Sequence, residues 1–219
     1  MWSEDVILMI LNGVKETLYM TLASTILGYV FGLPMGICLA VSDKDGLKPN
    51  AVLYKILDLI SNIVRSIPFL ILFNPCDTAH EIARGAKLRI ISNHCSLVVA
   101  AVPFIARMVE SSAKEVDEGV IEAAKAMGAG NFTIITRVLL VEARTSLITG
   151  ATIAIGTILG YSAMAGTVGG GGLGDIAIRY GYYRYQSEIM IVTVVLLVIL
   201  VQIFQSAGMK AASVLDKRK

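Results

Sequence analysis

Two cysteines and two histidines fall within one short polar segment and together suggest a metal site. Cys76 and His80 are four residues apart, a spacing that places both side chains on one face of a helix. His94 and Cys95 are adjacent, so their side chains would point apart. Structural zinc sites usually show C-x₂₋₄-C and H-x₃₋₅-H spacings. We therefore expect no metal ion to be bound.

A second pattern with possible chemistry is Gly169-x-Gly171-x-x-Gly174, which formally matches the dinucleotide-binding fingerprint. That fingerprint works between a strand and a helix of a βαβ unit, whereas here it follows a long apolar run. The chain also has no G-x-x-x-x-G-K-[ST] motif, so no phosphate-binding loop for ATP is visible. We expect no cofactor and no enzymatic activity, and any ATP hydrolysis would belong to a separate chain.

Asp58 and Arg65 are ionisable residues in an otherwise apolar run. Charged groups at membrane depth usually pair or line a water-filled path. Two interpretations of Arg65 stay open: it faces a bundle interior, or its helix starts later and the side chain snorkels to the interface. The predicted spans offer no histidine beside these two groups, which argues against a membrane-embedded enzyme.

The composition indicates that membrane spans hold these residues in place. Of the 219 residues, 55% are hydrophobic and 16% are charged, and the mean hydropathy is +0.71. Soluble domains average about 25% charged residues. The length suits a single domain over residues 1–219, and a net charge of +2 is too small to favour a nucleic-acid partner.

Five apolar runs predict the transmembrane helices, because about 20 apolar residues cross the hydrocarbon core. The runs are 17–41, 56–73, 96–106, 145–174 and 189–209. The first and the last two carry no charge, whereas the third is only about half as long as a full span. We predict an all-α polytopic bundle of about five transmembrane helices.

The distribution of charge predicts how these helices are oriented. The tail 217–219 is wholly basic, and the long loop 108–144 carries several basic residues, so both are expected to be cytoplasmic. Glu4 and Asp5 give the N-terminus an acidic start, which indicates an external N-terminus and argues against a cleaved signal peptide. Five crossings connect these assignments.

Glycines repeat at helical spacing in two of the predicted spans. Gly28, Gly32 and Gly36 recur every fourth residue, and Gly156 and Gly160 do so in a later span. Small residues at this spacing let another helix approach closely. An alternative is that small residues are simply common in membrane helices.

The loop 108–144 contains the most informative pattern. Acidic residues from Glu115 onward precede apolar residues at helical spacing and predict a short amphipathic helix that ends at Gly128. A second helical pattern follows over 132–139. Two short helices joined by a glycine turn would present a protruding knob to a soluble partner.

This loop resembles the EAA loop of ABC importer permeases. The matching residues are 122–124, Gly128 after three further residues, and 138–140 after nine more. In that family the helix before the glycine docks into a groove of the ATPase subunit and transmits its motion. The implied coupling residues are Glu122, Ala123, Ala124, Met127, Gly128 and Leu140. The family pattern ends in Leu-Pro, but here Val141 follows, which puts the bend into the next span in doubt.

Further blocks resemble methionine ABC importer permeases, namely 65–69, 103–107, 160–166 and 170–174. The translocation path implied by the resemblance contains Arg65, Tyr161, Ser162 and Met164. The implied external gate or docking loop contains Gly170, Gly171, Gly172 and Gly174. For Ser162 and Met164, helix packing is the alternative role.

The resemblance implies a type I importer fold and a homodimer in the bacterial cytoplasmic (inner) membrane. Two copies of an ABC ATPase and an extracytoplasmic methionine-binding protein would be its partners, and methionine would cross by alternating access. The substrate follows only from the resemblance, so a permease for another amino acid or small solute is an alternative. A channel or secondary transporter without an ATPase is a different class, and it predicts an inverted repeat that we do not find.

Two segments stay open. Residues 74–96 are polar where the family has an apolar stretch, and we hypothesise a local reading-frame slip that leaves the third span in question. Reading the DNA in the other frames would test this, since an apolar run is expected in one of them. The four tyrosines of 180–185 predict either an interfacial aromatic belt or a docking surface for the binding protein.

Overall fold

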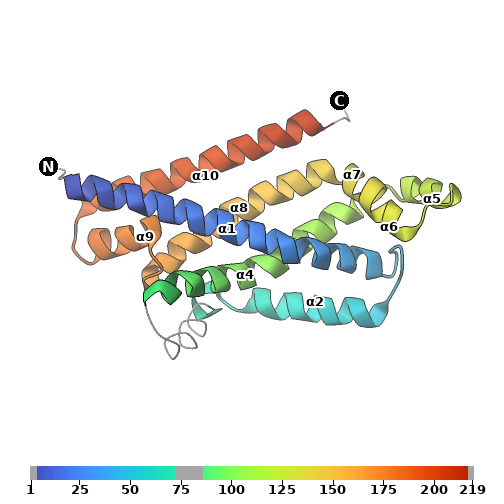
Figure 1. Cartoon of the computed structure of the whole chain (residues 1–219), viewed down its shortest axis with the longest axis horizontal. Helices are drawn as coiled ribbons and strands as arrows, with labels where there is room; N and C mark the ends of the chain where they lie inside the picture. The colour runs from blue at the N-terminus through green and yellow to red at the C-terminus, as the bar shows by residue number, and fades with distance from the viewer. Residues whose placement is uncertain (1–3, 73–85, 217–219) are drawn as a thin grey trace.

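The structure, a computed structural model, describes residues 4–72 and 86–216, with side chains from residue 95 onward in the second range. All regular structure in these ranges is helical, which confirms the predicted all-α bundle (Figure 1). The longer helices are α1 (Glu4–Ser42), α2 (Ala51–Ser66), α4 (Ala86–Lys114), α5 (Glu118–Ala126), α8 (Arg144–Ala165) and α10 (Ser187–Leu215). The shorter helices are α6 (Asn131–Thr133), α7 (Leu140–Glu142) and α9 (Gly172–Ile176).

Within the described ranges, four helical segments are long and apolar enough to cross a membrane. They are Glu4–Ser42, Cys95–Lys114, Arg144–Val168 and Ser187–Leu215. The first begins well before the predicted residue 17 and continues through Pro34. The third predicted run is also longer than expected, because the helix continues past residue 106 to Lys114. Residues 108–114 therefore belong to a helix and not to the predicted loop.

The helix α2 corresponds to the second predicted crossing, but it is shorter than a span. Its 16 residues rise about 24 Å, less than the roughly 30 Å of the hydrocarbon core. Helical backbone resumes over residues 69–72. Residues 73–85 lie outside the described ranges, so most of the segment in the reading-frame hypothesis remains untested.

Helices α1 and α4 pack closely because of the glycine repeat on α1. A Cβ atom at Gly28 would lie 3.0 Å from the Cβ of Ala101, and one at Gly32 would lie 2.9 Å from a methyl carbon of Ile105. A Cβ at Gly36 would overlap the backbone of α4. The predicted close approach is therefore confirmed for this repeat.

The core lies between α1, α4 and α8. Leu97, Ile105 and Val109 of α4 and Ile158 of α8 are all essentially inaccessible to solvent. The helix α10 runs along the outside of this core (Figure 1), and only 6% of its most apolar window is buried. An apolar helix that protein does not cover suits contact with lipid.

The glycine pair on α8 is not in tight contact with another described helix of the same chain. The nearest described atom to a Cβ at Gly156 would be Nε2 of Gln205 on α10, at an ordinary contact distance of 3.7 Å, and no described atom lies within 4 Å of a Cβ at Gly160. The close backbone approach predicted for these two glycines is therefore absent from the described part of one protomer.

Candidate functional site

Helix α5 begins and ends at residues whose chemistry fixes its limits. Asp117 caps it, because one carboxylate oxygen accepts a hydrogen bond of 2.7 Å from the backbone N–H of Gly119. Gly128 follows the C-cap Met127 with a φ of +79°, a conformation that glycine adopts readily and other residues rarely do. The predicted amphipathic helix and its glycine stop are present, although the helix starts at Glu118 and not at Glu115.

One face of α5 packs against the protein and the other is free in the protomer. Ala124 is 3% exposed, and Ile121 packs against the buried residues Val116 and Leu139. Met127 is 82% exposed, and Glu122, Ala123 and Gly128 are exposed as well. Of the predicted coupling residues, Ala124 therefore faces inward, whereas Glu122, Ala123 and Met127 present an outer surface.

The second helical pattern of the loop, predicted over 132–139, leads through α7 and a turn into α8. Residues 134–139 form a π-helix in which Ile134 and Leu139 are buried, while Phe132 just before it is 80% exposed. The chain then turns at Ala143, whose ψ is −4°, before α8 begins. Leu140 is half-buried and Val141 is exposed. The helices are thus separated by a turn without the family proline.

A network of charged side chains connects α4 to its neighbours close to α5. On α4, Arg107 pairs with Glu110 at 2.7 Å and Lys114 pairs with the same carboxylate at 2.8 Å. Arg107 also pairs with Asp58 of α2, and the Tyr54 hydroxyl of α2 donates to Glu110 at 3.2 Å. The Glu110 side chain is 5% exposed, so its charge is stabilised by these partners.

The network extends to the turn after α1 through Asp43. Lys114 donates to a carboxylate oxygen of Asp43 at 2.6 Å, and this hydrogen bond lowers the pKa of the Asp43 carboxyl below its ordinary value. Asp43 and Lys114 also line a hollow of about 350 Å³ together with Glu122 and Lys125 of α5. Helix α5 thus lies directly beside the network.

Sequence reasoning missed this network. It predicted a loop that begins just after Arg107, and it placed Asp58 in an otherwise apolar run without naming a partner for it. The available signal was the spacing of Arg107, Glu110 and Lys114, which places alternating charges on one helix face. That pattern shows the face, but not the partners on α2 and after α1.

The four predicted path residues differ in their exposure within the protomer. Arg65 is exposed on α2, and Met164 is 48% exposed on α8. The ring of Tyr161 stacks on Phe69 with a centroid distance of 4.8 Å. Ser162 is 1% exposed, and its hydroxyl donates to the backbone carbonyl of Leu159 at 2.8 Å. Arg65 and Met164 are thus exposed in the protomer, Tyr161 is half-buried and Ser162 is buried.

The glycine-rich segment is attached to α1. Gly171 and Gly172 have φ values of +84° and +75°. The N–H of Gly172 donates to a carboxylate oxygen of Glu16 at 2.8 Å, and that of Leu173 donates to the Thr17 hydroxyl at 2.9 Å. The two acceptors lie in the first span and were not predicted. They hold the start of α9 against α1.

The other predicted residues of this loop are buried. The N–H of Gly170 donates to the carbonyl of Ala165 at 2.9 Å. A side chain at Gly174 would overlap the backbone of Ala163. The glycines therefore allow a compact connection between α8 and α9, and the segment follows a helix rather than a strand.

Three of the four tyrosines near this end are strongly exposed. Tyr182, Tyr183 and Tyr185 are 62%, 68% and 89% exposed, and Tyr180 lies against the Arg184 guanidinium at 4.6 Å. Both predicted roles, an interfacial belt and a docking surface, are compatible with this exposure.

Metal-ligand residues do not cluster in the part of the chain that the structure describes. Cys95 is exposed at the surface. Cys76 and His80 lie outside the described residues, as does the side chain of His94.

Residues 32–214 match the family described as "Binding-protein-dependent transport system inner membrane component". The chain belongs to this family. It is 44% identical over 200 residues to the probable D-methionine transport system permease protein MetI of Vibrio cholerae, covering 91% of this chain and 89% of that one. It is 39% identical over 207 residues to the methionine import system permease protein MetP of Bacillus subtilis, covering 94% and 93%.

Solved structures show the same fold. A chain of the MetNI methionine ABC transporter in an inward facing conformation matches 99% of this chain and 100% of its own length, with a TM-score of 0.94 and 43% identity. An amino acid ABC transporter matches with a TM-score of 0.73 at 16% identity, which supports the fold alone. The resemblance to importer permeases is thereby confirmed, and the chain is a multi-pass membrane component of this type.

Proposed function

We propose that this chain is the permease subunit of an ATP-driven importer and that it translocates methionine across the bacterial cytoplasmic membrane. The observation that carries this proposal is the match over 99% of the chain to a subunit of a methionine ABC transporter. A permease for another small amino acid is the alternative, since the path residues alone do not identify the substrate.

The proposed permease carries out no covalent chemistry. ATP hydrolysis resides in two copies of a separate ATPase, which dock on the outer face of α5 at Glu122, Ala123 and Met127. Those residues are exposed in the protomer and stand on a helix that is rigidly capped at both ends. The proposed coupling region is the part of the predicted loop 108–144 that follows the end of α4 at Lys114, within a single domain of residues 1–219.

The packing of α5 explains how motion would reach the membrane spans. Ile121 packs α5 against the cluster that contains Ala113 at the end of α4 and Leu139, and α4 is in turn packed into the glycines of α1. The ion pairs of Arg107 connect α4 to α2. A displacement of α5 therefore moves α1, α2 and α4 together, which suits rocking between inward-open and outward-open states.

A second copy would complete the path. In one protomer, Ile153 and Met164 of α8 are nearly half exposed and Gly160 faces open space. Two copies that meet along this helix would enclose a path between them. In the proposed orientation the N-terminus is external and the C-terminus is cytoplasmic. The segment 170–174 then lies at the external side, where a methionine-binding protein delivers the substrate.

A matched pair of glycine variants tests the coupling role. Gly128 has φ of +79°, whereas nearby Gly130 has φ of −71°, and no described atom lies within 4 Å of a Cβ at either position. Gly128→Ala is therefore expected to disturb the turn after α5, and Gly130→Ala is not. We would reconstitute each permease with a methionine-importer ATPase and binding protein and measure ATP-dependent methionine uptake into vesicles.

The expected result is strongly reduced uptake for Gly128→Ala and unchanged uptake for Gly130→Ala, with both proteins inserted normally. Uptake by the parent chain without ATP would contradict the importer and favour a channel or secondary transporter. Uptake of another amino acid in preference to methionine would replace the substrate assignment.

A further inference from the structure

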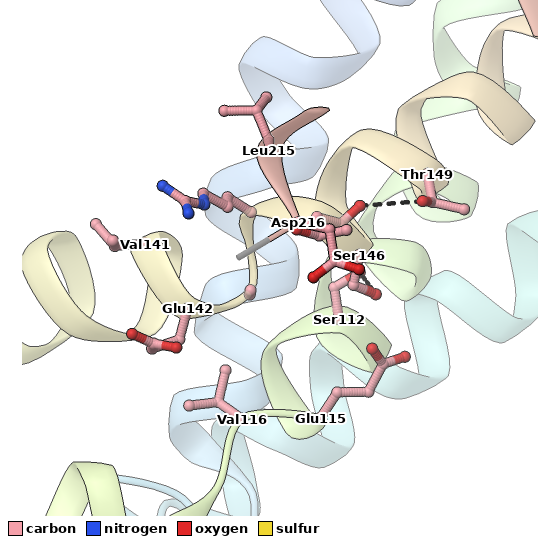
Figure 2. A pocket seen from close by; sticks show the side chains of 12 residues that line it. Ser112, Glu115, Val116, Val141, Glu142, Ser146, Thr149, Leu215 and Asp216 are labelled. Atoms are coloured by element: carbon pink, nitrogen blue, oxygen red, sulfur yellow. Dashed lines mark hydrogen bonds between the residues drawn. The ribbon is translucent and has the colours of Figure 1, made fainter. Parts of the chain in front are cut away.

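A cavity of about 410 Å³ lies where α4 ends, α8 begins and α10 ends (Figure 2). It is distinct from the hollow beside α5 and from the glycine-rich segment. Pockets that bind small molecules typically measure about 300–1,000 Å³, so this cavity has room for a free amino acid. In the proposed orientation it opens at the cytoplasmic side.

Hydroxyl groups form one part of the lining. The Ser146 hydroxyl donates to that of Ser112 at 3.0 Å, and the Thr149 hydroxyl donates to the carbonyl of Thr145 at 3.0 Å. Ser112 is 2% exposed, so it lies at the base of the cavity. Each hydroxyl oxygen can still accept a further hydrogen bond, which provides fixed polar groups for a ligand.

The charged lining carries both signs. Arg144 is the cationic residue, and Glu115, Glu142 and Asp216 are acidic. A guanidinium group binds a carboxylate through two parallel hydrogen bonds, and carboxylates bind an ammonium group. A ligand that carries both groups on one carbon, a zwitterionic amino acid, matches this combination.

An apolar part of the lining completes the match. Val116, Val141 and Leu215 contribute side chains to the same cavity (Figure 2). An amino acid held by its charged groups would place an apolar side chain, such as a thioether, against these residues. A small polar metabolite with two charges would leave that surface uncovered.

The position of the cavity on α8 connects it to the proposed path. Thr149, Ile153, Gly160 and Met164 follow one another at intervals of four, seven and four residues, so they share one face of the helix. The last three are open in the protomer. The cavity is therefore at the end of the helix face that would line a path between two copies.

We propose that this cavity binds a free zwitterionic amino acid, methionine in particular, as it leaves the path for the cytoplasm. This rests on the proposed function, because only then does the open face of α8 line a path. Arg144 binds the α-carboxylate, the acidic residues bind the α-ammonium group, and the valines and Leu215 contact the side chain.

Protection from thiol labelling tests the proposal. The three native cysteines, Cys38, Cys76 and Cys95, are replaced by serine. Thr149→Cys or Thr145→Cys is then introduced as a reporter inside the cavity, and Ser213→Cys, exposed on α10, serves as the control outside it. The permease–ATPase complex is placed in lipid nanodiscs and labelled with a maleimide in the absence of nucleotide. Labelling in the presence of methionine is compared with labelling in its absence.

At methionine about ten times the dissociation constant, mass action leaves roughly a tenth of the sites free, so labelling should slow about tenfold at both reporters. Labelling of Ser213→Cys should not change. Arg144→Gln should remove the protection, whereas Arg137→Gln, an exposed arginine outside the cavity, should retain it.

Ligand analogues identify the chemistry that is recognised. 3-Methylthiopropylamine lacks the carboxylate and 4-(methylthio)butanoate lacks the amine, and neither should protect at the concentration where methionine does. Phosphoethanolamine stands for a zwitterionic lipid headgroup and should not protect either. Protection by phosphoethanolamine, or equal labelling with and without methionine at both reporters, would overturn the proposal.

Methionine uptake by the cysteine-free complex is measured in parallel. If the complex with its native cysteines also takes up no methionine, the result counts against the proposed function. Normal uptake without protection would count against the cavity alone.

Discussion

The ammonium nitrogen of Lys114, at the last turn of α4, lies 2.6 Å from a carboxylate oxygen of Asp43, just after the end of α1. The two residues are 71 positions apart in the sequence, and their ion pair joins the ends of α1 and α4 on the side where α5 lies. The Asp43 side chain is 21% exposed and that of Lys114 is 42% exposed, so water screens the attraction in part. The pair fixes geometry more than it adds stability.

Asp43→Asn should therefore lower the free energy of unfolding by only about 1 kcal/mol or less. Since the hydrogen bond from Lys114 lowers the pKa of Asp43 in the folded state, its contribution is present above the unfolded-state pKa of about 3.9 and is lost as the pH falls through the folded-state pKa. Thermal unfolding in detergent can be measured from pH 7 down to about pH 3, which lies below that unfolded-state pKa. The stability of the parent chain should decline towards the acidic end of this range, and that of Asp43→Asn should decline less. Asp45→Asn, an exposed neighbour, should behave like the parent.

Glu110 should matter far more than Asp43. Its nearly buried carboxylate compensates both Arg107 and Lys114 and accepts from Tyr54. Glu110→Ala leaves Arg107 with less compensation at a largely buried position, and such changes typically cost about 3–5 kcal/mol. Thermal unfolding in detergent measures the loss, with Glu188→Ala, an exposed acid of α10, as the control. Equal stability of these two variants would show that the network is dispensable.

Much of this fold follows from local sequence signals. Long apolar runs identify α1, α8 and α10, because crossing the hydrocarbon core imposes both their length and their lack of charge. Gly128 identifies the end of α5, because its positive φ favours glycine. These features depend on nearby residues alone, so a single sequence is enough to predict them.

Other features depend on contacts between distant residues. The attachment of Gly172 to Glu16 joins positions 156 residues apart, and no local pattern in either segment indicates it. The inward direction of Ala124 depends on the packing of α5 against residues 134–139, and α4 continues past residue 106 although charged residues follow. The ion pairs of Arg107 offset the cost of its charge there, so hydropathy alone underestimates that helix.

Gly32→Ala should weaken the contact between α1 and α4. The new Cβ would lie 2.9 Å from both the Val102 carbonyl oxygen and a methyl carbon of Ile105, so the helices must move apart. Overpacking of this kind costs about 1–3 kcal/mol. Gly130→Ala is the control, because its φ is −71° and its Cβ would meet no described atom within 4 Å. Thermal unfolding of the two variants in detergent should rank Gly32→Ala clearly below Gly130→Ala, and the opposite order would contradict the packing described here.

Glu16 should hold the glycine-rich segment in place through its carboxylate. It accepts a hydrogen bond of 2.8 Å from the N–H of Gly172, and hydrogen bonds to charged groups contribute about 1.5–3 kcal/mol. Glu16→Ala leaves that N–H without this acceptor, whereas Glu16→Gln keeps an oxygen at the same place, so the alanine variant should loosen the segment more. Hydrogen exchange at residues 170–174 measures this directly, with Glu4→Ala, at an exposed position near the start of α1, as the control. Exchange that rises equally in the Glu16→Gln and Glu16→Ala variants would show that the negative charge, and not the hydrogen bond alone, holds the start of α9.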